Sequence, residues 1–151
     1  MHILMTGGTG LIGTATYAAL HEAGHKLTIL TRRGHPATND VTYVTALEDC
    51  AEPVDAVINL AGAGLADRRW SEAYKRQIVS SRVDLTRDLV AWLGELEHTP
   101  KRLISASAIG YYGAADERTF AEDGLPGAGF AAALCQSWEN EAGRATEYGT
   151  Q

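Results

Sequence analysis

The chain of 151 residues has the length of one domain, and its 45% hydrophobic and 21% charged residues are typical of a soluble globular fold. Its net charge of −6 argues against a nucleic-acid-binding surface, which needs an excess of lysine and arginine. Residues 1–13 lack the features of a signal peptide, and no segment approaches the roughly 20 apolar residues of a membrane span. We therefore expect the protein to bind neither nucleic acid nor a membrane.

Short apolar runs alternate with helical patterns along the chain. Five of these runs have the length and composition of strands: Ile3–Thr6, Lys26–Thr31, Val41–Val44, Ala56–Leu60 and Arg102–Ser107. The alternation predicts an α/β fold with a doubly wound parallel sheet of the Rossmann type, in the order 3-2-1-4-5. We expect residues 1–151 to form one nucleotide-binding domain, with its ligand at the carboxyl ends of strands one and four.

Three segments have helical patterns, over Leu11–Ala23, over Ser71–Glu97 and over residues 130–147. Gly24 should end the first helix in a left-handed conformation. The face of this helix toward the sheet is predicted to consist of small and apolar residues: Leu11, Ala15, Ala18, Ala19 and Ala23. Residues 45–53 form a poor helix at best, and residues 113–129 form a loop.

The first strand runs directly into a glycine-rich turn, Thr6-Gly7-Gly8-Thr9-Gly10-Leu11-Ile12-Gly13. Gly7 permits the sharp turn, Gly10 lets the backbone approach a pyrophosphate, and Gly13 lets the helix pack on the strand. Free amides and the positive end of the helix dipole then face the anion. We therefore predict a cofactor-binding turn made of the following residues: Gly7, Thr9, Gly10, Leu11, Ile12 and Gly13.

The second strand ends in Leu30-Thr31-Arg32-Arg33, without the carboxylate that holds the ribose 2′-hydroxyl of NAD. Two guanidinium groups stand ready to pair with a 2′-phosphate, so Arg32 and Arg33 favour NADP as the cofactor. The alternative is a pair of solvated loop arginines.

The fourth strand leads into Leu60, Ala61 and Gly62. These residues leave room for the adenosine and pyrophosphate to pass, although a plain strand-to-loop turn has the same composition.

Arg82 lies on the apolar stripe of the long helix, between Ile78 and Leu85. A charge there either reaches out to solvent along its stem or points at a cofactor phosphate or the substrate.

The fifth strand ends in a polar cluster that includes Ser105, Ser107 and Tyr111. Ser105 is expected at the cofactor, Ser107 can donate a hydrogen bond to a substrate carbonyl or hydroxyl, and Tyr111 and Tyr112 can line a nicotinamide pocket. A capped strand end with aromatic packing is the alternative.

Other residue types carry less information. Arg68-Arg69-Trp70 either clamps an anionic substrate or caps the long helix. His2 is expected at the surface, together with His35 and His98, and none has metal-ligand spacing. Cys50 and Cys135 are too few and too scattered for a disulfide framework or a metal site, so we expect reduced thiols, no metal and a cytoplasmic protein.

With these motifs in view, the chain resembles the extended, atypical branch of the short-chain dehydrogenase/reductase superfamily. The resemblance is greatest to the NAD-dependent epimerase/dehydratase family of nucleoside-diphosphate-sugar epimerase-like proteins. It implies NADP(H) binding through the glycine turn, Arg32, the strand-four exit and Arg82. It also implies that the chain corresponds to the N-terminal half, without the sixth strand and the C-terminal substrate subdomain. The outer edge of strand five would then be open to self-association.

The superfamily pairs a catalytic Tyr with a Lys four residues later, and this sequence contains no Tyr-x-x-x-Lys. Ala131 and Cys135 stand at the matching positions. Ser107 falls near the superfamily's catalytic Ser or Thr, and Tyr111 is a candidate substitute acid.

Three functions follow from these observations. The first is the cofactor half of an NADP-dependent, epimerase-like oxidoreductase acting on a small molecule, possibly a nucleotide sugar. The second is a non-catalytic NADP-binding or regulatory protein. The third is a flavin or other nucleotide binder on the same fold.

Overall fold

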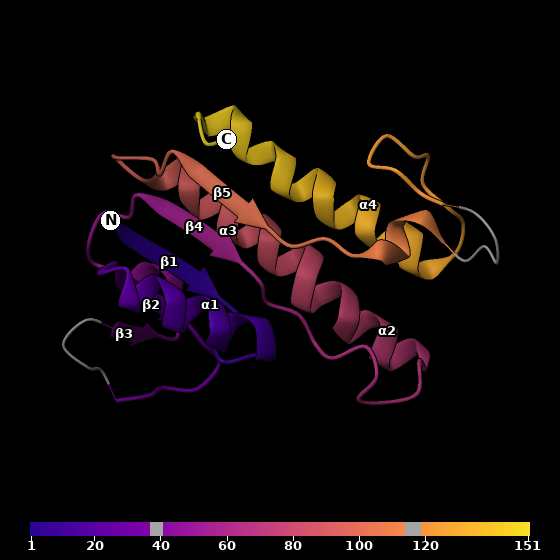
Figure 1. Cartoon of the computed structure of the whole chain (residues 1–151), viewed down its shortest axis with the longest axis horizontal. Helices are drawn as coiled ribbons and strands as arrows, with labels where there is room; N and C mark the ends of the chain where they lie inside the picture. Colours follow the sequence, from indigo (N-terminus) through magenta and orange to yellow (C-terminus); the bar gives the residue numbers. More distant parts are fainter. Residues whose placement is uncertain (37–40, 114–118) are drawn as a thin grey trace.

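The computed structural model describes residues 1–36, 41–113 and 119–151. Five parallel strands form its sheet in the order β3-β2-β1-β4-β5, as predicted (Figure 1). Their bounds lie within two residues of the predicted ones: β1 His2–Thr6, β2 Lys26–Leu30, β3 Val41–Val44, β4 Ala56–Asn59 and β5 Arg102–Ser105. Because all strands run the same way, their carboxyl ends meet at one edge of the sheet, which is where ligands bind in this type of fold.

The two faces of the sheet bury separate hydrophobic clusters. Successive side chains of a strand point to opposite faces, so Leu4 of β1 packs on one face while Ile3 and Met5 pack on the other. The Leu4 cluster contains Leu89 and Leu93 of α3, which spans Leu85–Glu95. The Ile3 and Met5 cluster is covered by α1, which spans Leu11–Glu22.

The predicted long helix runs in three parts, α2 (Glu72–Val79), the π-helical turn η2 (Ser80–Asp84) and α3. Ser71 caps its start by accepting a hydrogen bond from the Tyr74 amide at 3.2 Å. The last helix, α4 (Phe130–Gly143), packs beside α3 and continues into the 3₁₀ turn η4 (Arg144–Tyr148). Two further 3₁₀ turns complete the described structure, η1 (Leu47–Asp49) and η3 (Ile109–Tyr112).

The predicted inner face of α1 is wrong. All five residues assigned to it are exposed, whereas Gly13 is buried and Tyr17 and Leu20 pack against the sheet. Gly13, Tyr17 and Leu20 follow one another at steps of four and three, so they form the stripe that faces the strands. Tyrosine and leucine bury far more apolar area than alanine, and this difference decides which face turns inward. The prediction for Gly24 is confirmed, with φ at +77°.

The last residue adds to the outer edge of β5. The Gln151 amide donates to the Lys101 carbonyl at 3.1 Å, and the Leu103 amide donates to the Gln151 carbonyl at 2.7 Å. This is the hydrogen-bond pattern of a parallel pair, and it places Gln151 opposite Arg102. One end of the β5 edge is therefore already paired, while self-association through this edge stays a prediction.

Candidate nucleotide-binding groove

The glycine turn after β1 has the close contacts that its sequence predicts. Gly7 has a φ of +70°, and a Cβ there would lie 2.6 Å from the Leu60 carbonyl carbon. A Cβ on Gly13 would lie 2.1 Å from the Gly7 carbonyl oxygen. The turn closes on itself through a hydrogen bond from the Gly10 amide to the Gly7 carbonyl at 3.0 Å. Side chains at Gly7 or Gly13 would thus force the turn away from β4 and α1.

The first turn of α1 presents backbone donors at the end of the sheet. Its N-cap is Gly10, and no side chain caps it within the described residues. The first amides of a helix lack partners inside the helix and carry the positive end of its dipole. Leu11 and Ile12 are 93% and 68% exposed, so the backbone at this terminus is accessible to an anion.

A groove of about 670 Å³ lies along the carboxyl ends of the strands. The predicted residues Thr9, Gly10 and Arg32 line it, together with Leu60, Ala61 and Gly62. Its remaining walls come from the ends of β1, β2 and β3, from the β4 exit and from the long helix: Thr6, Gly7, Leu30, Thr31, Thr45, Ala63, Gln77, Ser80, Ser81, Asp84, Leu85 and Asp88. The strand-order reversal between β1 and β4 lies at its centre, as the fold rule predicts.

Eight predicted site residues lie apart from the lining that the structure describes for this groove: Leu11, Ile12 and Gly13 in the first turn of α1, and Arg33, Arg82, Ser105, Ser107 and Tyr111 elsewhere. Arg33 is exposed beyond Arg32. Ser105 accepts a hydrogen bond from the Asn59 amide group at 3.1 Å. Ser107 and Tyr111 lie past the end of β5, where the Tyr111 ring packs edge-on against Tyr112 at 5.2 Å.

Asn59, which the sequence reasoning missed as a polar centre, is 1% exposed at the end of β4. Its side-chain oxygen accepts from the Thr6 hydroxyl at 2.7 Å, and its amide donates to the Thr86 hydroxyl at 2.8 Å. Thr6 in turn accepts from the Ala61 amide at 3.2 Å, and Thr86 accepts from the Trp138 indole at 3.0 Å. A satisfied network of this kind fixes the glycine turn, the β4 exit and α4 relative to one another.

Arg82 projects from the π-helical turn η2 and is half-buried behind the β4 exit. Its Nη2 donates to the Ala63 carbonyl at 2.9 Å, and its guanidinium carbon lies 5.4 Å from the centre of the Trp138 ring. Burial lowers the pKa of Arg82, because desolvation disfavours the charged form. Neighbouring Ser81 fixes the same loop by accepting from the Ala63 amide at 2.9 Å.

A second polar cluster lies at the end of β5. The Ser107 hydroxyl donates to the carboxylate of Glu139 on α4, a contact that the sequence analysis does not predict. One helical turn earlier, the Cys135 thiol donates to the Ala108 carbonyl at 3.6 Å. Burial and then the Glu139 charge raise the pKa of Cys135, so the thiol is held neutral. Ala131 lies against Gly110, 3.2 Å from the position of a Cβ there.

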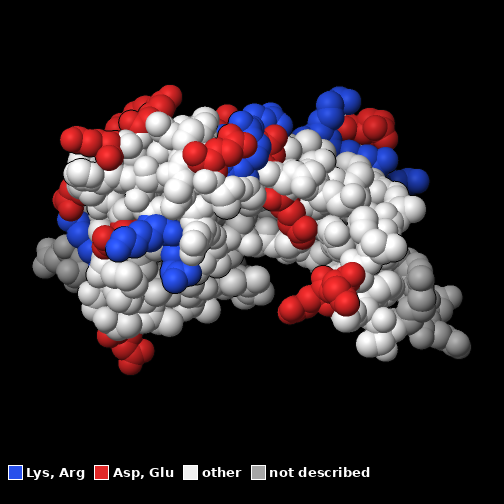
Figure 2. All heavy atoms as spheres, turned by 90° about the horizontal axis from the view of Figure 1, so that it is seen from above, with Lys and Arg blue, Asp and Glu red and all other residues white. Residues whose placement is uncertain are grey.

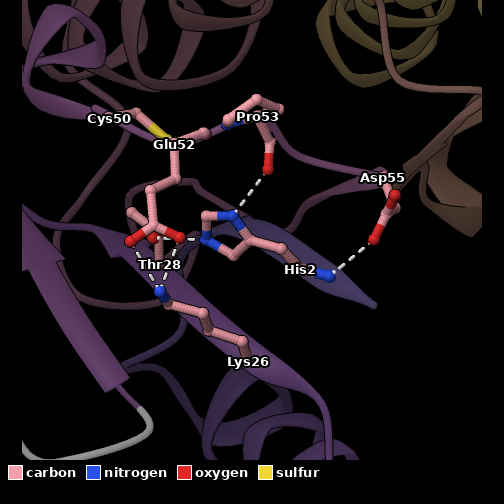
Figure 3. A network of polar contacts seen from close by, with 7 residues as sticks. All are labelled: His2, Lys26, Thr28, Cys50, Glu52, Pro53 and Asp55. Atoms are coloured by element: carbon pink, nitrogen blue, oxygen red, sulfur yellow. Dashed lines mark hydrogen bonds and ion pairs between the residues drawn. The ribbon is translucent and has the colours of Figure 1, made fainter.

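A third network lies at the amino end of the sheet, away from the groove (Figure 3). His2, predicted at the surface, is half-buried there: its Nδ1 donates to the Pro53 carbonyl at 2.8 Å, and its Nε2 lies 2.8 Å from the Thr28 hydroxyl. Lys26 binds Glu52 at 2.6 Å, and this hydrogen bond lowers the pKa of the Glu52 carboxyl. These contacts tie β1 and β2 to the connection that enters β4.

His, Cys, Asp and Glu form no group of three that could hold a metal, and no helix is long and apolar enough to cross a membrane, in the residues that the structure describes. Acidic and basic side chains are interspersed on the face that Figure 2 shows. In the loop after β4, the Trp70 indole donates to the Leu65 carbonyl at 2.8 Å, and Arg68 lies over the Tyr74 ring.

The parallel sheet, the glycine turn and the groove at the strand-order reversal together define a Rossmann-type nucleotide-binding domain. Comparison with known proteins agrees with this class. The chain belongs to the NAD dependent epimerase/dehydratase family, whose model matches residues 3–133.

The epimerase family protein YfhF of Bacillus subtilis is 38% identical over an alignment of 149 positions, which covers 93% of this chain and 49% of that protein. Among solved structures, human epimerase family protein SDR39U1 with NADPH superposes with a TM-score of 0.83 at 29% identity, over 94% of this chain and 48% of that one. A nucleoside-diphosphate sugar epimerase from Corynebacterium glutamicum gives a TM-score of 0.80 at 27% identity, over the whole of this chain and 32% of that one. The chain thus spans about half the length of the curated relatives it matches.

Proposed function

We propose that the groove binds NADP(H) and that the chain is the cofactor-binding part of an epimerase-like oxidoreductase. One observation carries this proposal: the glycine turn and Arg32 line the same groove, and the end of β2 has no carboxylate to repel a 2′-phosphate. The human relative solved with NADPH supports the choice of NADP, whereas other structural neighbours were solved with NAD.

The residues present fit such a cofactor. The amides that begin α1 would hold the pyrophosphate, with Gly7, Thr9, Gly10, Leu11, Ile12 and Gly13 shaping that turn. Arg32 would pair with the 2′-phosphate, with Arg33 near it. Leu60, Ala61 and Gly62 would let the dinucleotide pass closely along the β4 exit, since Gly62 adds no side chain to the groove wall.

A bound nicotinamide supplies hydride transfer to or from a carbon of the substrate. In our proposal Ser107 binds the oxygen on that carbon, because its hydroxyl stands past β5 at the carboxyl edge of the sheet. Its donation to Glu139 leaves the Ser107 lone pairs free to accept a hydrogen bond from a substrate hydroxyl. Tyr111 lies on the same connection and is our candidate for an acid. A nucleotide sugar is the substrate class supported by the Corynebacterium glutamicum epimerase named above and by a further structural neighbour that was solved with UDP-glucose and NAD.

Charge reversal at Arg32 tests the cofactor assignment. In Arg32→Glu we expect NADPH affinity to fall at least tenfold by calorimetry, because a charge-assisted pair is replaced by repulsion. Lys101→Glu is the matched control, since it makes the same change on an exposed side chain at the amino end of the sheet. Equal NADPH affinity in Arg32→Glu and the parent chain would refute the NADP assignment.

Our second candidate is a non-catalytic NADP-binding or regulatory protein. It is favoured by Ala131 and Cys135, which stand where the superfamily has its Tyr and Lys, and by the neutral, buried state of the Cys135 thiol. Turnover separates the two candidates: NADPH that protects the protein from melting but is not oxidised with any carbonyl or sugar nucleotide would favour binding without catalysis.

A further inference from the structure

Arg82 carries a half-buried positive charge, and the hydrogen-bond partners that the described residues give it are all neutral. Besides the Ala63 carbonyl, its Nη1 lies 3.4 Å from the Ser81 hydroxyl and 3.5 Å from the Ile78 carbonyl, both long for a hydrogen bond. In the described part of the chain, Arg82 forms no ion pair with an Asp or Glu side chain. A charge withdrawn from water in this way is costly until an anion joins it.

The guanidinium is held in one orientation. A Cβ on Gly62 would lie 2.7 Å from its central carbon, and 2.8 and 3.0 Å from its two terminal nitrogens. Because the carbon is nearer than either nitrogen, Gly62 faces the flat side of the group. Trp138 packs against it as well, at 5.4 Å. The N–H groups of Nη1 make only the two long contacts in the described residues, and a planar fork of this kind suits a carboxylate or a phosphate.

The position of Arg82 separates it from the proposed cofactor contacts. Gly62, Ala63 and Ser81 line the groove, whereas Arg82 is not among its described lining residues and lies behind that segment, toward α4. The pyrophosphate and the 2′-phosphate already have the start of α1 and Arg32. On its other side Arg82 lies near Cys135, where its charge works against the burial that raises the pKa of the thiol. That thiol donates a hydrogen bond to the carbonyl of Ala108, the residue next to Ser107.

We propose that Arg82 binds an oxyanion of the substrate, a carboxylate or a phosphate, while the reacting oxygen of the same substrate lies at Ser107. Arg82 is then a specificity-determining residue of the substrate site. This inference rests on the proposed function, because it assumes that the cofactor occupies the groove. Trp138 connects the two parts of this site, because its ring packs against Arg82 and the next residue, Glu139, accepts the hydrogen bond from Ser107.

Inorganic phosphate is the probe for this site. We would record ¹H–¹⁵N spectra of the chain during a phosphate titration, with and without saturating NADPH. The Trp138 indole proton is the reporter, assigned with Trp138→Phe, and the indole of Trp92 in the α3 core is the internal control. We expect a saturable Trp138 shift at constant ionic strength, both with and without NADPH.

Variants then separate binding from folding. Arg82→Gln should lower the affinity for phosphate at least tenfold. Arg82→Lys keeps the charge but not the planar fork, so its affinity should lie between those of the parent chain and Arg82→Gln. Arg76→Gln is the matched control, because Arg76 is an exposed arginine on α2, six residues before Arg82. The spectra themselves show whether each variant is folded.

Each outcome separates the two proposals. An unchanged phosphate response in folded Arg82→Gln, or no Trp138 response in the parent chain, would overturn the assignment. If NADPH abolishes the Trp138 response to phosphate, Arg82 binds the cofactor instead. That result would overturn this inference but leave the proposed function intact. Phosphate binding at Trp138 without any NADPH binding would refute the proposed cofactor but support the oxyanion site.

Discussion

At the scale of single residues, Asn59 is the side chain on which the geometry of the groove depends most. In Asn59→Ala the buried hydroxyls of Thr6 and Thr86 lose their shared partner. Leaving such groups unsatisfied costs about 2 to 3 kcal/mol, so the free energy of unfolding should fall by that amount. Urea denaturation would measure it as a lower midpoint with an unchanged slope.

Ser105→Ala is the matched control for this prediction. Ser105 is half-buried and contacts the same Asn59 amide at a longer 3.1 Å, so its loss should cost less than about 1 kcal/mol. A cost in Ser105→Ala equal to that of Asn59→Ala would show that the network does not centre on Asn59.

Sequence reasoning found the residues whose roles are encoded locally and missed those that depend on distant partners. The glycine turn, Arg32 and the Leu60–Gly62 segment lie next to strand ends, where the fold itself implies their role. Asn59, by contrast, gains its importance from Thr6, 53 residues away, and Ser107 meets Glu139 across 32 residues. Such pairs require the strand register and the packing of α4, which no local pattern specifies.

At the scale of elements, the packing of α1 on the glycine turn leaves no space for a methyl group. In Gly13→Ala the new Cβ would meet the Gly7 carbonyl and the Gly8 backbone, and neither can yield as a flexible side chain would. We expect lower stability, by about 1 to 3 kcal/mol, together with weaker NADPH binding as the turn shifts. Thermal melting and NADPH calorimetry on the same samples would measure both.

A glycine-to-alanine substitution in α4 should change the stability in the opposite direction. A Cβ on Gly143 would meet nothing within 4 Å, and Gly143→Ala should stabilise the protein by up to about 1 kcal/mol through helix propensity. Equal effects of the two substitutions would contradict the close-contact explanation for Gly13.

Helix and strand positions were largely predictable, while two details of the helices were not. Counting small and apolar residues in α1 chose the alanine face, because the count ignores how much area each residue buries. The π-helical turn η2 was missed within the long helix, since one extra residue in a turn leaves the apolar spacing on either side intact. The same turn carries Ser81 and Arg82, whose side chains form hydrogen bonds with the backbone of Ala63 in the β4 exit.

At the scale of the whole molecule, the sheet order followed from the alternation of strands and helices, because right-handed crossovers leave few arrangements. The hydrogen bonds of Gln151 with Lys101 and Leu103 did not follow from any motif. The groove joins the two halves of the sheet, since its walls come from β1 and β2 on one side of the order reversal and from β4 and the long helix on the other.

A ligand in that groove should therefore stabilise the fold as a unit. At 100 times its dissociation constant, NADPH would add about 2.7 kcal/mol, which for a chain of this size raises the Tm by about 5 to 10 °C. NADH at the same concentration should raise the Tm less, because it lacks the phosphate that Arg32 would bind. Added salt should narrow the difference by screening an exposed guanidinium. Differential scanning fluorimetry of the parent chain and Arg32→Gln would decide the point: equal shifts for NADPH and NADH in the parent, or a difference that persists in Arg32→Gln, would show that the 2′-phosphate is not recognised at this strand end.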